Sequence, residues 1–250
     1  MSQELKTLAH EAIDEMWAMR ENHSFQPTAD IDMVWVVSAP GTVKEAPNDW
    51  PYEDVLFDLD LVEEGIRVVK SVTGLRLGKD PKDVTKSDIE DYGPTLFYNG
   101  EDEETRDYKY PQNAHLREMM ANPNFPLPLS KVIIGRIPEI GTPAQVKELA
   151  RQLRQNSQRA QKIAVVAGLP HLARVGRYLS HHQELFPKEV EFVEDAVTQA
   201  HNELAIAGRE ARKVVKYYQM GHLARESRFR IDTSRIQRPD VLKELRIKRL

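Results

Sequence analysis

The chain has 250 residues, of which 40% are hydrophobic and 30% charged, a mixture typical of a folded domain with a substantial buried core. It contains no cysteine, which excludes disulfides, thiolate catalysis and cysteine-bound metals and fits a cytoplasmic location. No apolar run approaches the ~20 residues of a membrane span, and acidic side chains interrupt the N-terminal region. We therefore expect neither a membrane anchor nor a signal peptide.

The net charge of -4 conceals an asymmetry along the chain. Residues 207–250 contain thirteen Lys or Arg against five Asp or Glu, a net charge of +8 that leaves -12 for the rest. A basic tail is compatible with nucleic acid or an anionic surface, but no zinc-finger or RNA-recognition pattern accompanies this one. We therefore expect the tail to pack as a solvated helix against its own acidic domain, without nucleic acid.

The spacing of apolar residues predicts an amphipathic helix over about 3–21 at the start of the chain. Short apolar runs rich in β-branched residues follow, and most of them end in loops of small or polar residues. The predicted strands are 33–37, 95–98, 131–134, 162–167 and, more weakly, 190–193.

Helical patterns lie between these strands, near 60–71, 112–120, 146–153 and 172–179. Buried strands that alternate with helices predict a three-layer α/β/α sandwich with a mostly parallel, Rossmann-like sheet. Within it, residues 74–93 are predicted to be an insertion with one short helix.

The last part of the sequence has a different pattern. One long helix is predicted over 194–219, and another begins at Pro239. The expected organisation is an α/β domain over 1–194, which includes the N-terminal helix, and a helical extension over 195–250 that packs on the same domain.

Ligands of open parallel sheets bind outside the carboxyl ends of the strands, and the loops predicted there contain glycines and polar groups. We expect these loops to form one site. The candidate ligand-binding residues are Ser38, Gly41, Thr42, Asn99, Gly100, Thr142 and Arg174, and the candidate catalytic residues are Glu101, Glu139 and His171.

Each candidate also has a purely structural interpretation. Thr142 to Gln145 fits a capping box that starts a helix, although a helix start also attracts anions. Asn99-Gly100 fits a simple turn. His171 and Arg174 are three residues apart and share a helix face, where they offer a proton donor or acceptor and a fork for phosphate or carboxylate.

Several common sites are excluded by their missing motifs. Ser38 lacks the G-x-S-x-G turn of α/β-hydrolases, and the chain has neither a G-x-G-x-x-G nor a P-loop motif. The adjacent His181 and His182 point to different helix faces and make a poor metal pair. We expect no metal site.

The order of these loops resembles the YdcF/SanA/ElyC-like family over about residues 32–193. Asn99-Gly100-Glu101 stands where the family has a Ser-Gly-Gly-like turn, and Thr142 to Gln145 stands where it has a T-x-x-E-N-like helix start. The matching segments are Val36-Val37-Ser38-Ala39-Pro40-Gly41, Tyr98-Asn99-Gly100-Glu101, Glu139 with Thr142 to Gln145, and Gly168-Leu169-Pro170-His171-Leu172-Ala173-Arg174 with its H-x-x-R pattern.

The resemblance implies a Rossmann-like fold and a nucleotide-like ligand, because at least one family member binds S-adenosylmethionine. It therefore favours a small-molecule enzyme or binding protein, with transferase as the enzyme class. Two alternatives remain open. One is a non-catalytic interaction protein, possible as a homo-oligomer, that uses its C-terminal helices. The other is a phosphoester hydrolase in which Glu101 or Glu139 holds a divalent metal.

Overall fold

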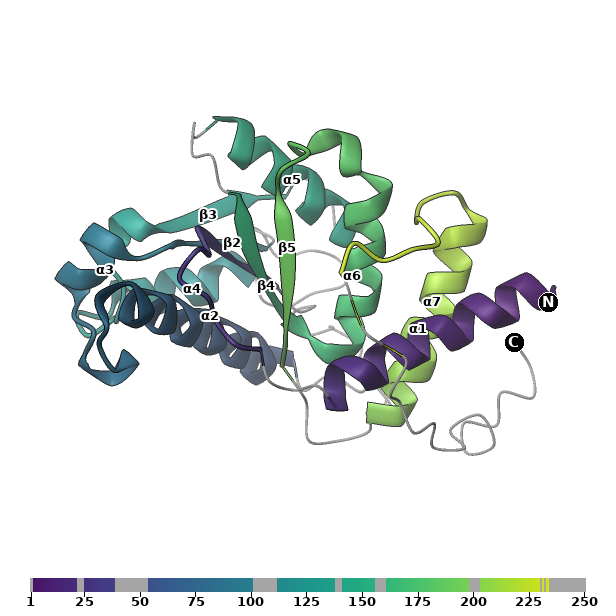
Figure 1. Cartoon of the computed structure of the whole chain (residues 1–250), viewed down its shortest axis with the longest axis horizontal. Coiled ribbons are helices and arrows are strands. Elements are labelled where there is room, and N and C mark those ends of the chain that lie inside the picture. Colours follow the sequence, from purple (N-terminus) through teal and green to yellow (C-terminus); the bar gives the residue numbers. More distant parts are fainter. Residues whose placement is uncertain are drawn as a thin grey trace.

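The computed structural model describes residues 2–21, 25–38, 54–100, 112–137, 141–155, 161–197, 203–229, 231 and 233. These residues form a twisted five-stranded sheet with helices on both faces, which confirms the predicted α/β fold (Figure 1). Helices pack on both sides because the central strands have apolar side chains on both faces. All five residues of the first strand are therefore buried.

The sheet is entirely parallel, in the order β3-β2-β1-β4-β5. The strands are β1 (Met33–Val37), β2 (Thr95–Gly100), β3 (Val132–Arg136), β4 (Lys162–Gly168) and β5 (Glu191–Val197). The chain proceeds outward from β1 to β3 and then returns to place β4 on the other side of β1. The carboxyl ends of β1 and β4 therefore flank the topological switch point, where ligands of such sheets bind.

The α-helices are α1 (Gln3–Glu21), α2 (Asp54–Leu77), α3 (Lys86–Tyr92), α4 (Gln112–Ala121), α5 (Thr142–Gln155), α6 (Leu169–His181) and α7 (Glu203–Gln219), and the short 3-10 helices are η1 (Pro81–Asp83), η2 (Leu129–Lys131) and η3 (Gln183–Leu185). Helices α2 and α4 pack on one face of the sheet, and α5 and α6 pack on the other. Helices α1 and α7 lie against each other and against α6, outside that second face (Figure 1).

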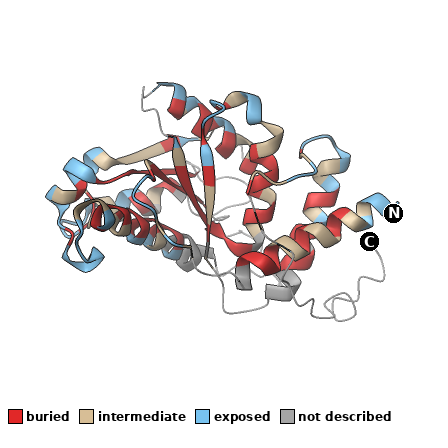
Figure 2. Ribbon diagram, viewed as in Figure 1, coloured by how far each residue is buried: buried red, intermediate tan, exposed pale blue. Residues whose placement is uncertain are grey.

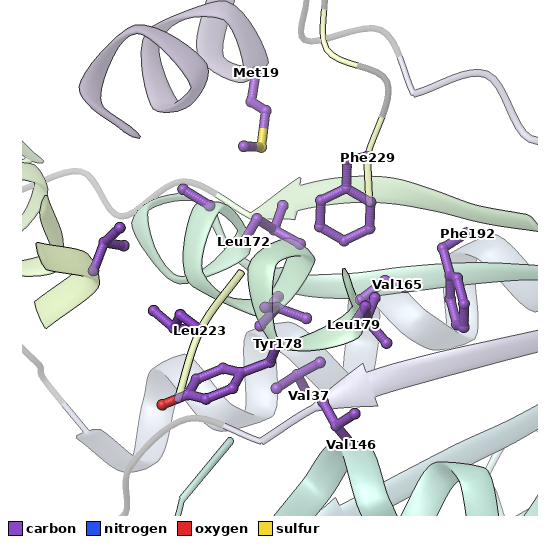
Figure 3. Close-up of a cluster of buried hydrophobic side chains, with 14 of the residues drawn as sticks. Met19, Val37, Val146, Val165, Leu172, Tyr178, Leu179, Phe192, Leu223 and Phe229 are labelled. Atoms are coloured by element: carbon purple, nitrogen blue, oxygen red, sulfur yellow. The ribbon is translucent and has the colours of Figure 1, made fainter. Parts of the chain in front are cut away.

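Each face of the sheet has its own hydrophobic cluster, because alternate strand residues point to opposite sides. Figure 2 shows buried residues running through the strands and along the inner faces of the helices. In the larger cluster, Met19 of α1 and Phe229 of the C-terminal segment join Leu172 and Leu179 of α6 (Figure 3). The C-terminal segment thus shares the core of the sheet domain.

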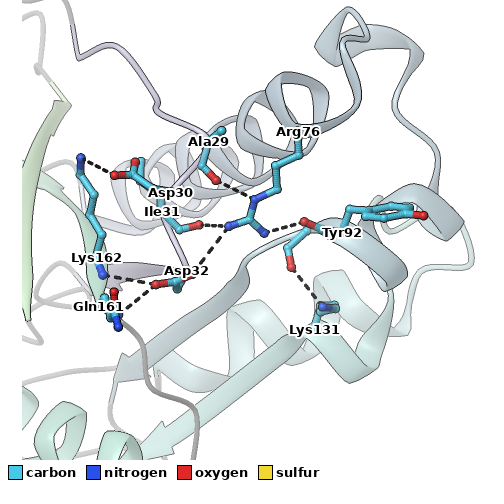
Figure 4. Close-up of polar contacts among 10 residues, drawn as sticks. Ala29, Asp30, Ile31, Asp32, Arg76, Tyr92, Lys131, Gln161 and Lys162 are labelled. Atoms are coloured by element: carbon cyan, nitrogen blue, oxygen red, sulfur yellow. Dashed lines mark hydrogen bonds and ion pairs between the residues drawn. The ribbon is translucent and has the colours of Figure 1, made fainter.

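Arg76, near the end of α2, holds the amino ends of the strands together (Figure 4). Its guanidinium donates to the carbonyl oxygens of Ala29, Ile31 and Tyr92 at 2.7, 2.8 and 2.6 Å. It also lies 3.8 Å from Asp32, which accepts a 2.9 Å hydrogen bond from the backbone that leads into β4. One side chain therefore joins the segments before β1 and β2, and through Asp32 the start of β4.

The structure corrects two predicted boundaries. Asn99-Gly100 is not a turn but the end of β2, because the buried amide of Asn99 finds hydrogen-bond partners inside the protein. Residues 194–197 are not helical but complete β5, since Val193, Asp195 and Val197 continue the alternation of the strand. Helix α7 begins only at Glu203.

The first crossover helix is also longer than predicted. α2 continues to Leu77, so the predicted insertion over 74–93 starts inside it and contains η1 and α3. None of the helices in the described part of the chain is long and apolar enough to cross a bilayer. The predicted helix after Pro239 lies outside the described residues.

Candidate functional site

Six of the predicted site residues lie at the carboxyl edge of the sheet in the described part of the chain, and they form two groups. Gly41, Thr42, Glu101 and Glu139 lie outside the described residues. The described six are Ser38, Asn99, Gly100, Thr142, His171 and Arg174.

The first group is a buried amide network beneath the edge, built around Asn99. The Asn99 side chain accepts from the Trp35 indole N–H at 2.9 Å and donates to the Gln145 carbonyl oxygen at 2.7 Å. The Gln145 amide donates to the Ser38 hydroxyl at 2.6 Å and to the Asn99 carbonyl oxygen at 3.0 Å, and Ser38 donates to that same carbonyl oxygen. These bonds join β1, β2 and α5 where the strands end.

Asn113 extends this network to β3. Its side-chain oxygen accepts from the Gly100 N–H, and its amide donates to the carbonyl oxygens of Gly100 and Gly135 at 2.9 and 3.1 Å. Ser38, Asn99 and Asn113 are buried, and their hydrogen bonds connect the ends of β1, β2 and β3. Their side chains therefore fix the floor of the site. The structure does not place them on its open surface.

Helix α5 starts at this edge in a way that the sequence only partly predicts. Gly141 has a φ of 121°, a conformation that glycine alone adopts without strain, and Pro143 follows Thr142 in the first turn. The predicted capping box does not form, because the Gln145 side chain turns inward to the amide network. Thr142 is therefore not engaged with Gln145 and meets another side chain.

The second group, which we call the helix-start cluster, consists of Thr142, His171, Arg174, Glu210 and Lys213. Thr142 in the first turn of α5 and His171 in the first turn of α6 are hydrogen-bonded, with 2.7 Å between Oγ1 and Nε2. One turn further along α6, Arg174 Nε lies 2.9 Å from Glu210 of α7. Lys213 Nζ lies 2.7 Å from the other oxygen of the same carboxylate.

Burial and charge set the protonation states in the helix-start cluster. Burial, assisted by the charge of Arg174, lowers the pKa of His171 to about 3, so its imidazole is neutral at physiological pH. Burial alone would raise the pKa of Glu210, but the charges of Arg174 and Lys213 outweigh it and lower the pKa. The cluster therefore contains two cations, one carboxylate and one neutral imidazole.

A pair of carboxyl groups lies on the opposite face of the sheet, between α2 and β5. Burial raises the pKa of Asp195, and the hydrogen bond and negative charge of Glu64 raise it further. Arg67 donates to Glu64 at 2.7 and 2.9 Å but reaches only within 3.9 Å of Asp195. At neutral pH the two carboxyl groups therefore share a proton.

Sequence reasoning missed the residues that complete these groups. Glu210 and Asp195 lay in the stretch predicted as one long helix, and Gln145 was assigned to a helix cap. The β-branched and aromatic residues Val190, Phe192, Val193 and Val197 were the available signal for a strand that includes Asp195. Nothing in the sequence marks Glu210 as the partner of Arg174.

Comparison of the chain with models of protein families, with curated proteins and with solved structures finds no match. The site is therefore interpreted from its own chemistry. Within the described ranges, no three His, Asp or Glu side chains gather closely enough to hold a metal ion. The described residues bring a neutral imidazole, a hydroxyl and a partly buried, mostly cationic group of charges to the carboxyl edge.

Proposed function

We propose that this chain binds a small nucleotide-like molecule at the carboxyl edge of its sheet, with S-adenosylmethionine as the first candidate. The observation that supports this is the hydrogen bond between Thr142 and His171, which joins two separate crossover connections beside the switch point. We further propose that the chain belongs to the YdcF/SanA/ElyC-like family, on the loop order described above.

The helix-start cluster favours an anionic group on that ligand. The first turns of α5 and α6 each leave backbone N–H groups without helical partners, and such helix starts attract anions. Arg174 and Lys213 add two positive charges, of which Glu210 compensates one. A carboxylate, as in the amino-acid end of S-adenosylmethionine, or a phosphate would complement this charge.

The same residues have distinct roles in this proposal. His171 is neutral, so one of its ring nitrogens can donate a hydrogen bond and the other can accept one, and Thr142 holds its Nε2. Arg174 is already paired with Glu210, so it supplies positive charge from a fixed position. Glu101 and Glu139 would accept from ribose hydroxyls or an amine. If the chain is an enzyme, we propose a transfer reaction in which a bound anionic ligand raises the pKa of His171 toward neutral, so that it acts as the proton-transfer group.

The test is a thermal-shift and calorimetric titration of the purified chain with S-adenosylmethionine, S-adenosylhomocysteine, ATP and inorganic phosphate. A ligand that binds only the folded state adds about 2.7 kcal/mol of stability at a hundredfold excess over Kd. We expect an adenosine compound to raise the melting temperature, and His171→Gln to weaken its binding by about tenfold through the loss of one polar contact worth about 1.4 kcal/mol.

A second variant within the site and a control variant outside it show whether binding depends on this site. Arg174→Gln combined with Glu210→Gln removes the buried ion pair and leaves only Lys213, which is 38% exposed, without its carboxylate partner. It should also weaken binding, because the fixed guanidinium of Arg174 is lost. His181→Gln, at the opposite end of α6, should leave binding unchanged. A folded chain that binds no adenosine compound would contradict the proposal. Phosphoester hydrolysis that disappears with EDTA would favour the metal-assisted hydrolase instead.

A further inference from the structure

The helix-start cluster sets one carboxylate between two cations that come from different helices. Glu210 of α7 lies with Oε2 2.9 Å from Arg174 Nε of α6 and with Oε1 2.7 Å from Lys213 Nζ of α7. The carboxylate cancels one of the two positive charges, so the three ions together carry one net positive charge. Glu210 thus fixes how much positive charge this part of the sheet edge offers to a ligand.

Two titratable side chains beside these ions are neutral. Burial, assisted by the charge of Arg174, lowers the pKa of His171 to about 3. Burial raises the pKa of Tyr178 to about 12, so its hydroxyl stays protonated at neutral pH. Neither ring changes the net charge that the three ions give to the described part of the cluster.

Glu210 lies deeper in the protein than the cations that it contacts. The side chain of Glu210 is 0% exposed, whereas those of Arg174 and Lys213 are 13% and 38% exposed. A ligand that approaches from solvent therefore meets the cations first, and Glu210 lies behind them as a fixed counter-charge. Because water and salt screen such partly buried charges only weakly, a surplus charge here is costlier than the same charge at the surface.

This net charge distinguishes between the two kinds of anionic group that the cluster could bind. A carboxylate brings one negative charge and would leave the three ions and the ligand group neutral together. A phosphate monoester has a second pKa near 6 and brings a charge of about −1.5 to −2 at neutral pH. It would leave a surplus negative charge, which Glu210 repels.

We propose that Glu210 selects a ligand whose anionic group is a carboxylate and disfavours a ligand that ends in phosphate. The inference rests on the proposed function, because it concerns the ligand at the same edge of the sheet. It narrows that ligand to a nucleoside derivative with a carboxylate, and it makes nucleotides weak competitors. Glu210 acts through the cations in front of it, so it determines specificity without contacting the ligand.

Two ligands that share a nucleoside and differ in the anionic group provide the test, adenosine 5′-carboxylate and AMP. Calorimetric titration of the full-length chain would give the ratio of their dissociation constants. We expect the wild type to bind the carboxylate about tenfold more tightly than AMP, the direction that charge complementarity requires. Glu210→Gln raises the net charge by one and should lower this preference by about tenfold or more.

Two further variants separate the effect of charge from that of structure. Lys213→Gln removes a partly exposed cation, so it should raise the preference for the carboxylate, and it tests the proposal even if Glu210→Gln does not fold. Glu210→Gln combined with Lys213→Gln restores the net charge and should restore the wild-type ratio. Glu184→Gln, the same substitution at an exposed position after α6, should leave the ratio unchanged.

The outcomes distinguish the selectivity from the proposed function. If neither compound binds to the folded wild type, the proposed function fails, and the inference fails with it. If both compounds bind and the ratio is unchanged in Glu210→Gln and in Lys213→Gln, only the selectivity is overturned. A wild type that prefers AMP would also overturn the selectivity alone.

Discussion

The neutral state of His171 gives the clearest expectation for a single residue. Burial lowers the pKa of His171 to about 3 from its ordinary value of 6.5. Between these values the unfolded chain binds a proton that the folded chain does not, so this residue's contribution to stability is present above pH 6.5 and is lost as the pH falls. His171→Gln should therefore reduce the acid sensitivity of the unfolding free energy. Urea denaturation at several pH values between 4 and 7 would measure it, and identical pH slopes would contradict it.

Asp195 has the opposite dependence, because its pKa is raised. Burial and the neighbouring Glu64 raise the pKa of Asp195 from its ordinary 3.8, so the folded chain retains a proton that the unfolded chain releases. Its contribution to stability is present at low pH and is lost as the pH rises toward the raised pKa. Asp195→Asn keeps the hydrogen bond and cannot ionise. The unfolding free energy of this variant should rise relative to that of the wild type as the pH rises from 4 to 8, and urea denaturation would measure it. A difference in unfolding free energy that does not change with pH would argue against a shared proton.

At the residue scale, the sequence predicted which side chains follow the strands but not what they contact. His171 and Thr142 come together because both begin helices that leave the same sheet edge, which strand order alone implies. The partner of Arg174 comes from α7, in a later segment of the chain. No local pattern encodes a contact of that kind, and the inward turn of Gln145 depends on the same long-range packing.

Among the elements, α2 depends on Arg76 for its attachment to the amino ends of the strands. Three backbone carbonyl groups accept from one guanidinium that is partly buried. Hydrogen bonds to a charged group contribute about 1.5–3 kcal/mol each, less when solvent can replace them. We expect Arg76→Met to lower the unfolding free energy by about 2–4 kcal/mol, from the same principle. Lys82→Met, at an exposed position on η1, should change the unfolding free energy by less than about 0.5 kcal/mol. Similar losses for Arg76→Met and Lys82→Met would contradict the role of Arg76 in attaching α2.

The contact of α2 with β1 depends on a glycine. A Cβ at Gly65 would lie 2.4 Å from Val36 Cγ2 and 3.2 Å from Leu96 Cδ1, so α2 approaches the strands closely at this turn. Alanine at a helix interior normally gains about 1 kcal/mol over glycine, whereas overpacking costs about 1–3 kcal/mol. Gly65→Ala should therefore destabilise the chain in thermal and urea unfolding. Leu75→Ala, at an exposed position of the same helix, should have little effect, and a stabilised Gly65→Ala would show that the contact can relax.

Element boundaries were predicted where the apolar pattern is continuous and missed where polar residues are buried. The bounds of β1 agree with the predicted bounds, because all five of its residues are apolar. β2 and β5 are longer than predicted, since Asn99 and Asp195 are polar residues that the strands bury with partners. Burial of a polar group depends on its hydrogen-bond partner, and that partner is a property of the fold.

For the whole molecule, buried ion pairs attach the outer helix layer to the sheet domain. Arg177 of α6 is almost completely buried and forms a two-pronged ion pair with Glu15 of α1, with one bond of 2.9 Å. It also donates to the carbonyl oxygens of Ala173 and Arg225, so it joins α1, α6 and the segment after α7. Arg225 in turn lies 3.1 Å from Glu11, a second contact between α1 and the segment after α7.

The arrangement of Arg177 predicts that α1, α7 and the sheet unfold together. Glu15→Ala leaves the Arg177 charge buried without its partner, which costs about 3–5 kcal/mol, whereas Glu15→Leu with Arg177→Met replaces the pair by apolar groups and should cost much less. Urea unfolding of the wild type, followed by far-ultraviolet circular dichroism and by tryptophan fluorescence, should give coincident transitions, because Trp17 lies on α1 and Trp35 in β1. A fluorescence transition that precedes the circular dichroism transition would mean that the outer helices unfold as an independent layer. A double variant as unstable as Glu15→Ala would mean that Arg177 does not couple these helices to the sheet.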